Sequence, residues 1–351
     1  MRIAVYKDNL STGRGADHLI CAHAEGLLEL GHDVTIVTCP NSREFTFAVA
    51  DGVKVEFVPR GSIREFVSSF DACVAAGSNE ILDLTCGGRV EPPVRTVTEL
   101  MLAPRGFFKW KHFIRNARIK RAFNLSHALQ ILCASYEKEL RKFAPLPKVA
   151  TIPEWPDVRK PTADELSGAN RRKIIVYPAA INKLKNQMLA IRAFGRLADE
   201  FPDWELHIYG KMHKSYGPRC VATVRRMGLE HRIMFMPFTK DLPSVYASAS
   251  IMAFPSLLEG FPLTIVEGAR FALPVVVVEE LPGARDMVKD GENGIISRND
   301  VNDYAASLRL LMADESLRSA MGMRARDMCE TNYTREGAMS KMDALIHEVT
   351  S

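Results

Sequence analysis

The sequence predicts two doubly wound α/β domains, because short β-branched runs alternate with longer amphipathic stretches along the whole chain. A proline-containing segment of mixed polarity, residues 153–170, interrupts the alternation and is typical of a linker. A chain of 351 residues also exceeds one ordinary core and fits two domains of common size. In parallel sheets of this class ligands bind beyond the carboxyl ends of the strands, so we expect the site in the cleft between the two facing domains.

The predicted elements follow in order. Before the linker, strands are expected at Arg2–Tyr6, Val34–Thr38, Val53–Val58, Ala72–Ala76, Val94–Thr98, Leu129–Ala134 and Val149–Ile152. Helices are expected there at Ala16–Leu30, Phe107–Phe123 and Tyr136–Phe143. After the linker, strands are expected at Lys173–Tyr177, Glu205–Tyr209, Arg232–Met236, Ile251–Phe254 and Val275–Val278. Helices there are expected at Asn186–Glu200, Arg219–Met227, Leu263–Phe271, Tyr304–Ala313, Leu317–Cys329 and Glu336–Val349.

Composition narrows the class of protein. Hydrophobic residues make up 47% and charged residues 25%, which is globular composition. A net charge of +4 gives no support to a nucleic-acid partner. The seven cysteines are never spaced as C-x-x-C, which argues against a disulfide framework and a zinc site and favours a reducing compartment. Because no signal-peptide pattern and no apolar run of about 20 residues is present, we expect a cytoplasmic protein.

The segment 256–268 carries the strongest chemical signal. It reads Ser-Leu-Leu-Glu-Gly-Phe-Pro-Leu-Thr-Ile-Val-Glu-Gly and joins the predicted strand ending at Phe254 to the helix beginning near Leu263. Unpaired N–H groups and the helix dipole favour a diphosphate at such a helix start. Glu259 and Glu267, eight residues apart, can each accept hydrogen bonds from sugar hydroxyls. The alternative is that Glu259 only complements the dipole and that Glu267 is a solvated helix residue.

This segment resembles the Glu-x7-Glu motif of family 4 retaining glycosyltransferases with the GT-B fold, which consists of two Rossmann-like domains. Other stretches are similar to that family in the same order along the chain. They are Gly13-Arg14-Gly15-Ala16, Leu30-Gly31-His32-Asp33-Val34, Lys185-Asn186-Gln187, Leu206-His207-Ile208-Tyr209-Gly210, Ile233-Met234-Phe235-Met236-Pro237, Phe271-Ala272-Leu273-Pro274-Val275-Val276 and Asp290-Gly291-Glu292-Asn293-Gly294. The resemblance implies an acceptor-binding domain at 1–155, a donor-binding domain at 156–335, and a C-terminal helix, 336–351, that packs back on the first domain.

The resemblance also implies roles for single residues. Glu267 would bind the donor ribose, Glu259 the hydroxyls of the transferred sugar, and Lys185 the departing diphosphate. The remaining donor-binding residues implied are Gly13, Gly15, Gly210, Phe238, Gly260, Phe261, Leu263 and Thr264. The backbone amides of Phe261, Leu263 and Thr264 would hold the phosphates, and glycines 13 and 15 would let the backbone approach the donor. An ordinary tight turn is the alternative for each of these two glycines.

Two positions depart from the family pattern. Ala180 stands where the family usually has an arginine, five residues before Lys185, and Asn182 or Lys183 is the candidate replacement. Glu99 stands where many members have a histidine, so we take Glu99 as a substitute catalytic candidate. These departures keep open a non-catalytic protein that binds nucleotide sugars or glycans.

Residues Arg105–Arg121 form a basic, aromatic stretch. Seven of these 17 residues are Lys or Arg and none is acidic. A basic amphipathic helix with aromatic residues suits an anionic membrane surface, and relatives use a comparable patch to reach lipid-linked acceptors. The alternative is a solvated charged face over an aromatic core contact.

The resemblance therefore implies a retaining glycosyltransferase of envelope polysaccharide assembly that needs no cofactor and no metal. Its partners would be a UDP- or GDP-linked sugar and a glycan or lipid-linked acceptor, with peripheral binding at the inner face of the cell membrane. A nucleotide-sugar epimerase on the same fold is the further alternative. A dinucleotide site is rejected because His18 replaces the third glycine of G-x-G-x-x-G.

Overall fold

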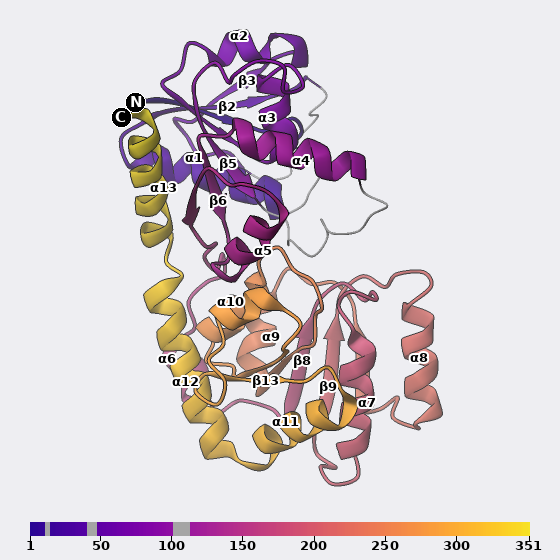
Figure 1. Ribbon diagram of the computed structural model, residues 1–351. Helices are drawn as coiled ribbons and strands as arrows, with labels where there is room; N and C mark the ends of the chain where they lie inside the picture. The colour runs from indigo at the N-terminus through magenta and orange to yellow at the C-terminus, as the bar shows by residue number, and fades with distance from the viewer. Residues whose placement is uncertain (11–14, 41–47, 101–112) are drawn as a thin grey trace. The chain divides into compact units, whose positions relative to one another are not determined.

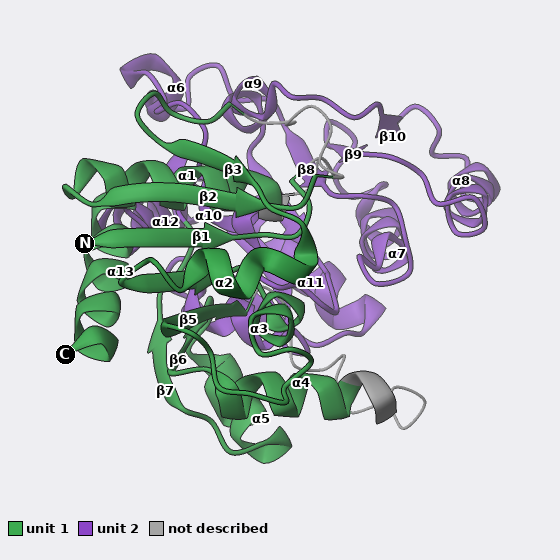
Figure 2. Cartoon of the chain, turned by 90° about the horizontal axis from the view of Figure 1, so that it is seen from above, with its two compact units in different colours: residues 1–154, 335–351 green, residues 155–334 purple. Residues whose placement is uncertain are grey.

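The computed structural model describes residues 1–10, 15–40, 48–100 and 113–351. The chain divides into two compact units (Figure 2). Unit 1 comprises Met1–Glu154 and Arg335–Ser351, and unit 2 comprises Trp155–Thr334. Each unit has its own parallel sheet and its own core, so each is described by itself.

The sheet of unit 1 has the strand order β3-β2-β1-β4-β5-β6-β7, and every neighbouring pair is parallel. Its strands are β1 (Arg2–Tyr6), β2 (Asp33–Thr38), β3 (Lys54–Phe57), β4 (Ala72–Ala75), β5 (Arg95–Leu100), β6 (Ala128–Ile131) and β7 (Lys148–Thr151). The order reverses between β1 and β4, because β2 and β3 extend the sheet on one side and β5 to β7 on the other.

Helices link and cover these strands. They are α1 (Gly15–Glu29), α2 (Ile63–Val67), α3 (Ser78–Leu84), α4 (Phe113–Leu125), α5 (Ser135–Phe143) and the C-terminal α13 (Arg335–Thr350). Helix α13 packs on α1 and β5 of unit 1, although it follows the whole of unit 2 in the sequence (Figure 1). Gly26 of α1 allows this approach, since a Cβ there would lie 2.6 Å from the Met339 side chain.

The sheet of unit 2 has the order β10-β9-β8-β11-β12-β13 and is also parallel throughout. Its strands are β8 (Ile174–Pro178), β9 (Glu205–Tyr209), β10 (Ile233–Met236), β11 (Ile251–Phe254), β12 (Val275–Val278) and β13 (Gly294–Ser297). Its helices are α6 (Ala163–Ser167), α7 (Gln187–Leu197), α8 (Gly217–Arg226), α9 (Leu242–Ser248), α10 (Leu263–Arg270), α11 (Val301–Ala313) and α12 (Glu315–Asn332).

The central strands of unit 2 explain the continuous apolar runs in the sequence. Every residue of β8, β11 and β12 is buried, including the four consecutive valines of β12. A parallel sheet covered by helices on both faces removes both sides of each strand from water, so alternation of polar and apolar residues is lost. The same burial holds for β4 and β6 in unit 1.

Most expected elements are present within a few residues of their expected ends. The short helices α2, α3 and α9 and the strand β13 were not expected, because they are too short to show a helical period and contain no continuous apolar run. The segment expected to be a linker contains α6, which begins with a capping box between Thr162 and Glu165. The part of the expected helix Phe107–Phe123 that precedes residue 113 lies outside the described residues.

Within the described ranges, none of the helices combines the length and the apolar character needed to cross a bilayer.

Helix α12 packs so closely on the end of α10 that a substitution of Gly322 tests the contact. A Cβ at Gly322 would lie 2.1 Å from the Ala272 carbonyl oxygen, a backbone atom that cannot turn aside. Although alanine favours a helix interior, we expect Gly322→Ala to lower the free energy of unfolding by about 1–3 kcal/mol in a urea titration.

Gly195→Ala in α7 is the matched control, since the nearest atom to its Cβ is the terminal methyl of Met227. That flexible side chain can move, so Gly195→Ala should lower the free energy of unfolding less than Gly322→Ala does. Equal stability of the two variants would contradict the packing described.

Candidate functional site

The strand order of unit 2 determines where the candidate site lies. Strand β8 is followed by β9 and β10 on one side, whereas β11, β12 and β13 lie on the other side. The connections that leave the carboxyl ends of β8 and β11 therefore diverge to opposite faces of the sheet, and a crevice opens between them. This is where parallel sheets of this class hold their ligands.

Lys185 and Glu259 meet at this crevice. Lys185 lies in the loop after β8, Glu259 lies in the loop after β11, and Lys185 Nζ forms an ion pair with Glu259 Oε1. Ser256 Oγ donates a hydrogen bond of 2.7 Å to the same carboxylate oxygen. The side chains of Lys185 and Glu259 are 23% and 11% exposed, so the pair is partly desolvated but still reached by solvent.

Hydrogen bonds hold the two loops together. The backbone N–H of Leu257 donates to the Leu184 carbonyl at 2.8 Å. The Tyr177 hydroxyl, which comes from β8, donates to the Lys185 carbonyl at 2.5 Å. The backbone at Lys185 is thus held by contacts with the loop after β11 and with strand β8.

The loop after β8 is built around Asn182. Its Oδ1 accepts hydrogen bonds from the backbone N–H groups of Leu184 at 2.9 Å and Lys185 at 3.2 Å. Asn182 thus uses its acceptor to shape the turn, whereas Lys183 is exposed. The carbonyl of Ala180 accepts a 3.0 Å bond from Gln187 Nε2 at the start of α7. Of the two candidate replacements for the missing arginine, only Lys183 brings a positive charge.

Helix α10 carries the second glutamate. Glu267 is only 7% exposed, and the Tyr246 hydroxyl of α9 donates a 2.7 Å hydrogen bond to its Oε2. Burial raises the pKa of Glu267, and the Tyr246 hydrogen bond opposes this in part. At the start of α10 the Leu263 N–H donates to the Phe261 carbonyl at 2.9 Å. The neighbouring Thr264 is half-buried.

Two further predicted residues lie at the carboxyl ends of β9 and β10. Gly210 has a φ of 135°, and a Cβ there would lie 2.5 Å from the Ala179 carbonyl oxygen, so the close approach of these chains requires glycine. Phe238 is 61% exposed, and the Lys211 ammonium lies 5.8 Å from its ring centroid. An exposed aromatic ring beside a cation suits a planar, negatively charged ligand.

A comparison with protein families agrees with this geometry. The family described as "Glycosyl transferases group 1" matches residues 160–328, which include Lys185, Glu259 and Glu267. Residues 160–328 of this chain are thus similar to the group 1 glycosyl transferase family.

Curated relatives support the same assignment over part of their length. An uncharacterized glycosyltransferase of Haemophilus influenzae is 33% identical over 135 residues, 38% of either chain. The N-acetylgalactosamine-N,N'-diacetylbacillosaminyl-diphospho-undecaprenol 4-alpha-N-acetylgalactosaminyltransferase of Campylobacter jejuni is 28% identical over 159 residues, 45% of this chain and 42% of the relative. The chain thus spans about two fifths of the length of these relatives.

Solved structures resemble the whole chain in fold. Anabaena Alr3699/HepE in complex with UDP and glucose superimposes with a TM-score of 0.79 at 15% identity and covers 99% of both chains. The two parallel-sheet domains of this chain have the GT-B fold.

The structure brings together some of the residues singled out in the sequence. Within residues 160–328, Lys185 and Glu259 are in contact, and the half-buried Gly260 and Phe261 follow Glu259 directly. The supporting residues Ser256 and Tyr246 were missed, because a serine after a strand and a helical tyrosine carry no signal of their own. Gly13 lies outside the described residues, and Gly15 begins α1.

Glu99 lies in unit 1 near the end of β5 and is 1% exposed. His23 Nδ1 lies 2.6 Å from its Oε1, and its Oε2 is buried without a hydrogen-bond partner among the described residues. The carboxylate is therefore held inside unit 1 and does not face solvent.

Unit 1 has a charged cluster at its own strand-order reversal. Lys7, just after β1, pairs at 2.8 Å with Glu80 of α3, which follows β4 and is 3% exposed. Asp8 lies 3.4 Å from Lys7 and 3.1 Å from Arg60. Burial raises the pKa of Glu80, and the Lys7 ammonium opposes this in part. This cluster was not predicted, because its members come from segments that are far apart in the sequence.

Unit 1 also holds a group with metal-ligating side chains. Asp343 Oδ1 lies 2.7 Å from His32 Nε2 and 3.5 Å from His347 Nε2, and the three ligand atoms lie within 4.8 Å of one another. These residues join the α1–β2 turn, at the amino-terminal end of β2, to α13.

Removal of Lys7 should leave Glu80 buried without its cation. We expect Lys7→Met to lower the free energy of unfolding by about 2–4 kcal/mol, less than for a fully buried pair because the Lys7 side chain is 18% exposed. Since the pKa of Glu80 is already raised and rises further without Lys7, the loss should grow as pH increases above 4.5. Urea titrations at several pH values measure this loss of unfolding free energy.

The double variant Lys7→Met/Glu80→Gln removes both charges and should recover most of the stability. If Lys7→Met is as stable as the unmodified chain at neutral pH, Lys7 does not stabilise the buried carboxylate of Glu80.

Proposed function

We propose that the chain is a retaining glycosyltransferase that moves a sugar from a nucleotide-sugar donor to a glycan or lipid-linked acceptor in envelope polysaccharide synthesis. The observation that carries the proposal is the Lys185–Glu259 pair at the strand-order reversal of unit 2, inside the segment that matches the group 1 family. A cation at this place would neutralise the negative charge that develops on a departing diphosphate, and the carboxylate beside it would accept hydrogen bonds from sugar hydroxyls.

The donor would lie along the carboxyl ends of the unit 2 strands. Its diphosphate would take the place next to Lys185 and the start of α10, where it would compete with the Glu259 carboxylate for the lysine. Glu267 would accept hydrogen bonds from the ribose, and the exposed ring of Phe238 would contact the base. The Anabaena protein in complex with UDP and glucose supports a UDP-linked sugar as the first donor to test.

The chemistry requires that negative charge on the departing diphosphate be neutralised. We assign this role to Lys185, with backbone N–H groups at the start of α10, so activity should persist when EDTA is added. Retention at the anomeric carbon follows if the acceptor hydroxyl attacks on the face that the diphosphate leaves, with a diphosphate oxygen taking its proton.

Unit 1 would bind the acceptor. Its charged cluster around Lys7, Glu80 and Arg60 offers both donors and acceptors of hydrogen bonds to a polyhydroxyl compound. The name of the Campylobacter relative specifies a diphospho-undecaprenol compound, which supports a lipid-linked acceptor for this chain. Arg118 and Lys120 of α4 are exposed and would add to attraction by an anionic membrane surface.

A binding protein without transferase activity is the second candidate. It is favoured by Ala180, which supplies no charge to the phosphates, and by the burial of Glu99 against His23. Donor binding with no turnover over a broad acceptor panel would select this candidate.

A substitution of Glu267 should affect donor binding and the stability of the free chain in different directions, so the two effects can be measured separately. Because the folded-state pKa of Glu267 is raised, the buried carboxylate costs stability increasingly as pH rises above 4.5. We expect Glu267→Gln to be at least as stable as the unmodified chain at pH 8, since Gln can still accept the Tyr246 hydrogen bond. The same variant should lose the stabilisation that UDP gives the unmodified chain, which is about 2.7 kcal/mol at 100 times the Kd and is followed as an increase in Tm.

Glu292→Gln changes an exposed glutamate of the same unit and should leave both quantities unchanged. A screen with UDP, GDP and ADP identifies the base. Undiminished stabilisation of Glu267→Gln by every nucleotide that binds the unmodified chain would remove Glu267 from the site.

Lys185→Met should reduce transfer from the preferred nucleotide sugar by about 100-fold or more, because the leaving diphosphate loses its cation. The control Lys289→Met removes an exposed lysine elsewhere in unit 2 and should retain full activity. Proton NMR of the product gives its anomeric configuration. An inverted product would exclude the retaining mechanism, and full activity of Lys185→Met would exclude the assigned role.

A further inference from the structure

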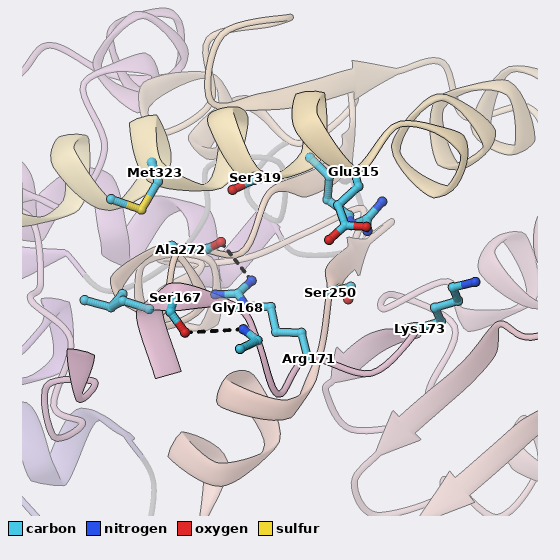
Figure 3. A pocket seen from close by; sticks show the side chains of 12 residues that line it. Ser167, Gly168, Arg171, Lys173, Ser250, Ala272, Glu315, Ser319 and Met323 are labelled. Atoms are coloured by element: carbon cyan, nitrogen blue, oxygen red, sulfur yellow. Dashed lines mark hydrogen bonds and ion pairs between the residues drawn. The ribbon is translucent and has the colours of Figure 1, made fainter. Parts of the chain in front are cut away.

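A pocket of about 240 Å³ lies in unit 2, and its walls include the segments that enter the amino-terminal ends of the strands (Figure 3). Lys173 directly precedes β8, Ser250 directly precedes β11, and Ala272 lies between α10 and β12. Lys185 and Glu259 follow the carboxyl ends of β8 and β11. The pocket is therefore at the opposite edge of the sheet from the proposed donor site.

Arg171 crosses the pocket below the helix α12, which presents Glu315, Ser319 and Met323 toward it (Figure 3). One terminal nitrogen of Arg171 donates to the Ala272 carbonyl at 3.1 Å and the other donates to the Phe271 carbonyl. Its Nε is buried and has no hydrogen-bond partner in the described part of the chain. A buried charged donor without an acceptor is costly, so this N–H favours an acceptor from outside the chain.

Arg318 brings a second guanidinium to the same pocket. It lies over the Trp204 ring at 5.2 Å and donates to the Leu311 carbonyl at 2.8 Å. Burial and then the charge of Arg318 lower the pKa of Arg171 to about 10, and burial lowers the pKa of Arg318. Both groups remain charged at neutral pH, and each raises the electrostatic cost of the other.

The carboxylates of Glu315 and Asp314 favour the charged form of Arg318, whereas the pKa of Arg171 is shifted by burial and by Arg318. Glu315 lies 3.8 Å from Arg318, but its side chain is 89% exposed, where water screens the pair. Lys173 is itself a cation, and Asp203 pairs with it at 3.1 Å. The lining of the pocket thus has three cationic side chains, one carboxylate and an unused donor.

A purely structural role explains only part of this arrangement. Arg171 satisfies carbonyl groups just after α10, which accounts for its two terminal nitrogens. That role does not account for the unpaired Nε, for the second arginine or for the open volume beside them.

We propose that this pocket is a binding site for a small phosphate-bearing anion, separate from the donor site. Phosphate oxygens would accept hydrogen bonds from the two guanidinium groups, which present several donors in a fixed plane. The hydroxyl groups of the lining serines, Ser167, Ser250 and Ser319, offer further polar contacts. The volume lies below the range of about 300–1,000 Å³ of common drug-sized sites, so it suits a phosphate or a small phosphorylated compound.

Inorganic phosphate is the probe, and the thermal stability of the full chain is followed at constant ionic strength with chloride as the reference salt. We expect Ser319→Glu to weaken the apparent phosphate affinity by roughly tenfold or more, because its carboxylate pairs with the arginines in place of the anion. Ala320→Glu is the matched control: it adds the same charge one residue further along α12, at an exposed position that does not line the pocket. Glu315→Gln removes the nearby carboxylate and should strengthen binding.

Lys185→Met separates this site from the opposite edge of the sheet and should leave the pocket's response to phosphate intact. Loss of the response in Ser319→Glu, with retention in Ala320→Glu and Lys185→Met, supports the proposal. The proposal is overturned if phosphate stabilises the chain no more than chloride does. It is also overturned if Ser319→Glu and Ala320→Glu respond alike, or if Lys185→Met alone abolishes the response. Failure of the donor-site proposal would leave these outcomes unchanged.

Discussion

The reversal of strand order in a parallel sheet is the constraint on which the rest of this structure depends. It places the loops after β8 and β11 side by side, so that Lys185 and Glu259, far apart in the sequence, form one ion pair. Unit 1 repeats the arrangement, because the reversal between β1 and β4 brings Lys7 to Glu80. In each unit a lysine after the first central strand meets a glutamate after the second.

These sites cost stability, and the surrounding structure offsets the cost. Glu267 and Glu80 are buried carboxylates whose pKa values are raised, and each has one neutral or cationic partner that partly restores the charged form. The apolar strands β8, β11 and β12 supply the rigid frame that keeps such groups in place. A protein selected for stability alone would replace both glutamates, so their burial favours a functional origin.

Much of the fold could be predicted from the sequence, because buried parallel strands are continuous apolar runs and their helices are long enough to show a period. The site was predictable only where a motif exists: the spacing of Glu259 and Glu267 indicated both residues, and the order of the motifs indicated Lys185. Tyr246 and the Lys7–Glu80 pair depend on contacts across 21 and 73 positions, which no local pattern records, and Ser256 was missed because a serine after a strand carries no signal of its own. The four-residue strand β13 was missed because its sequence, Gly-Ile-Ile-Ser, is not a continuous apolar run like those of the equally short β11 and β12.

Hydrogen–deuterium exchange of the full chain, with and without saturating UDP, tests most directly the claim that the nucleoside diphosphate binds at the β8/β11 reversal. The account predicts slower exchange in residues 179–187 and 256–268, the loops that carry Lys185 and Glu259 and the start of α10, while 163–173 in the amino-terminal wall of the pocket are unchanged. Protection confined to other segments, or bound UDP with no protection in these two loops, would contradict it.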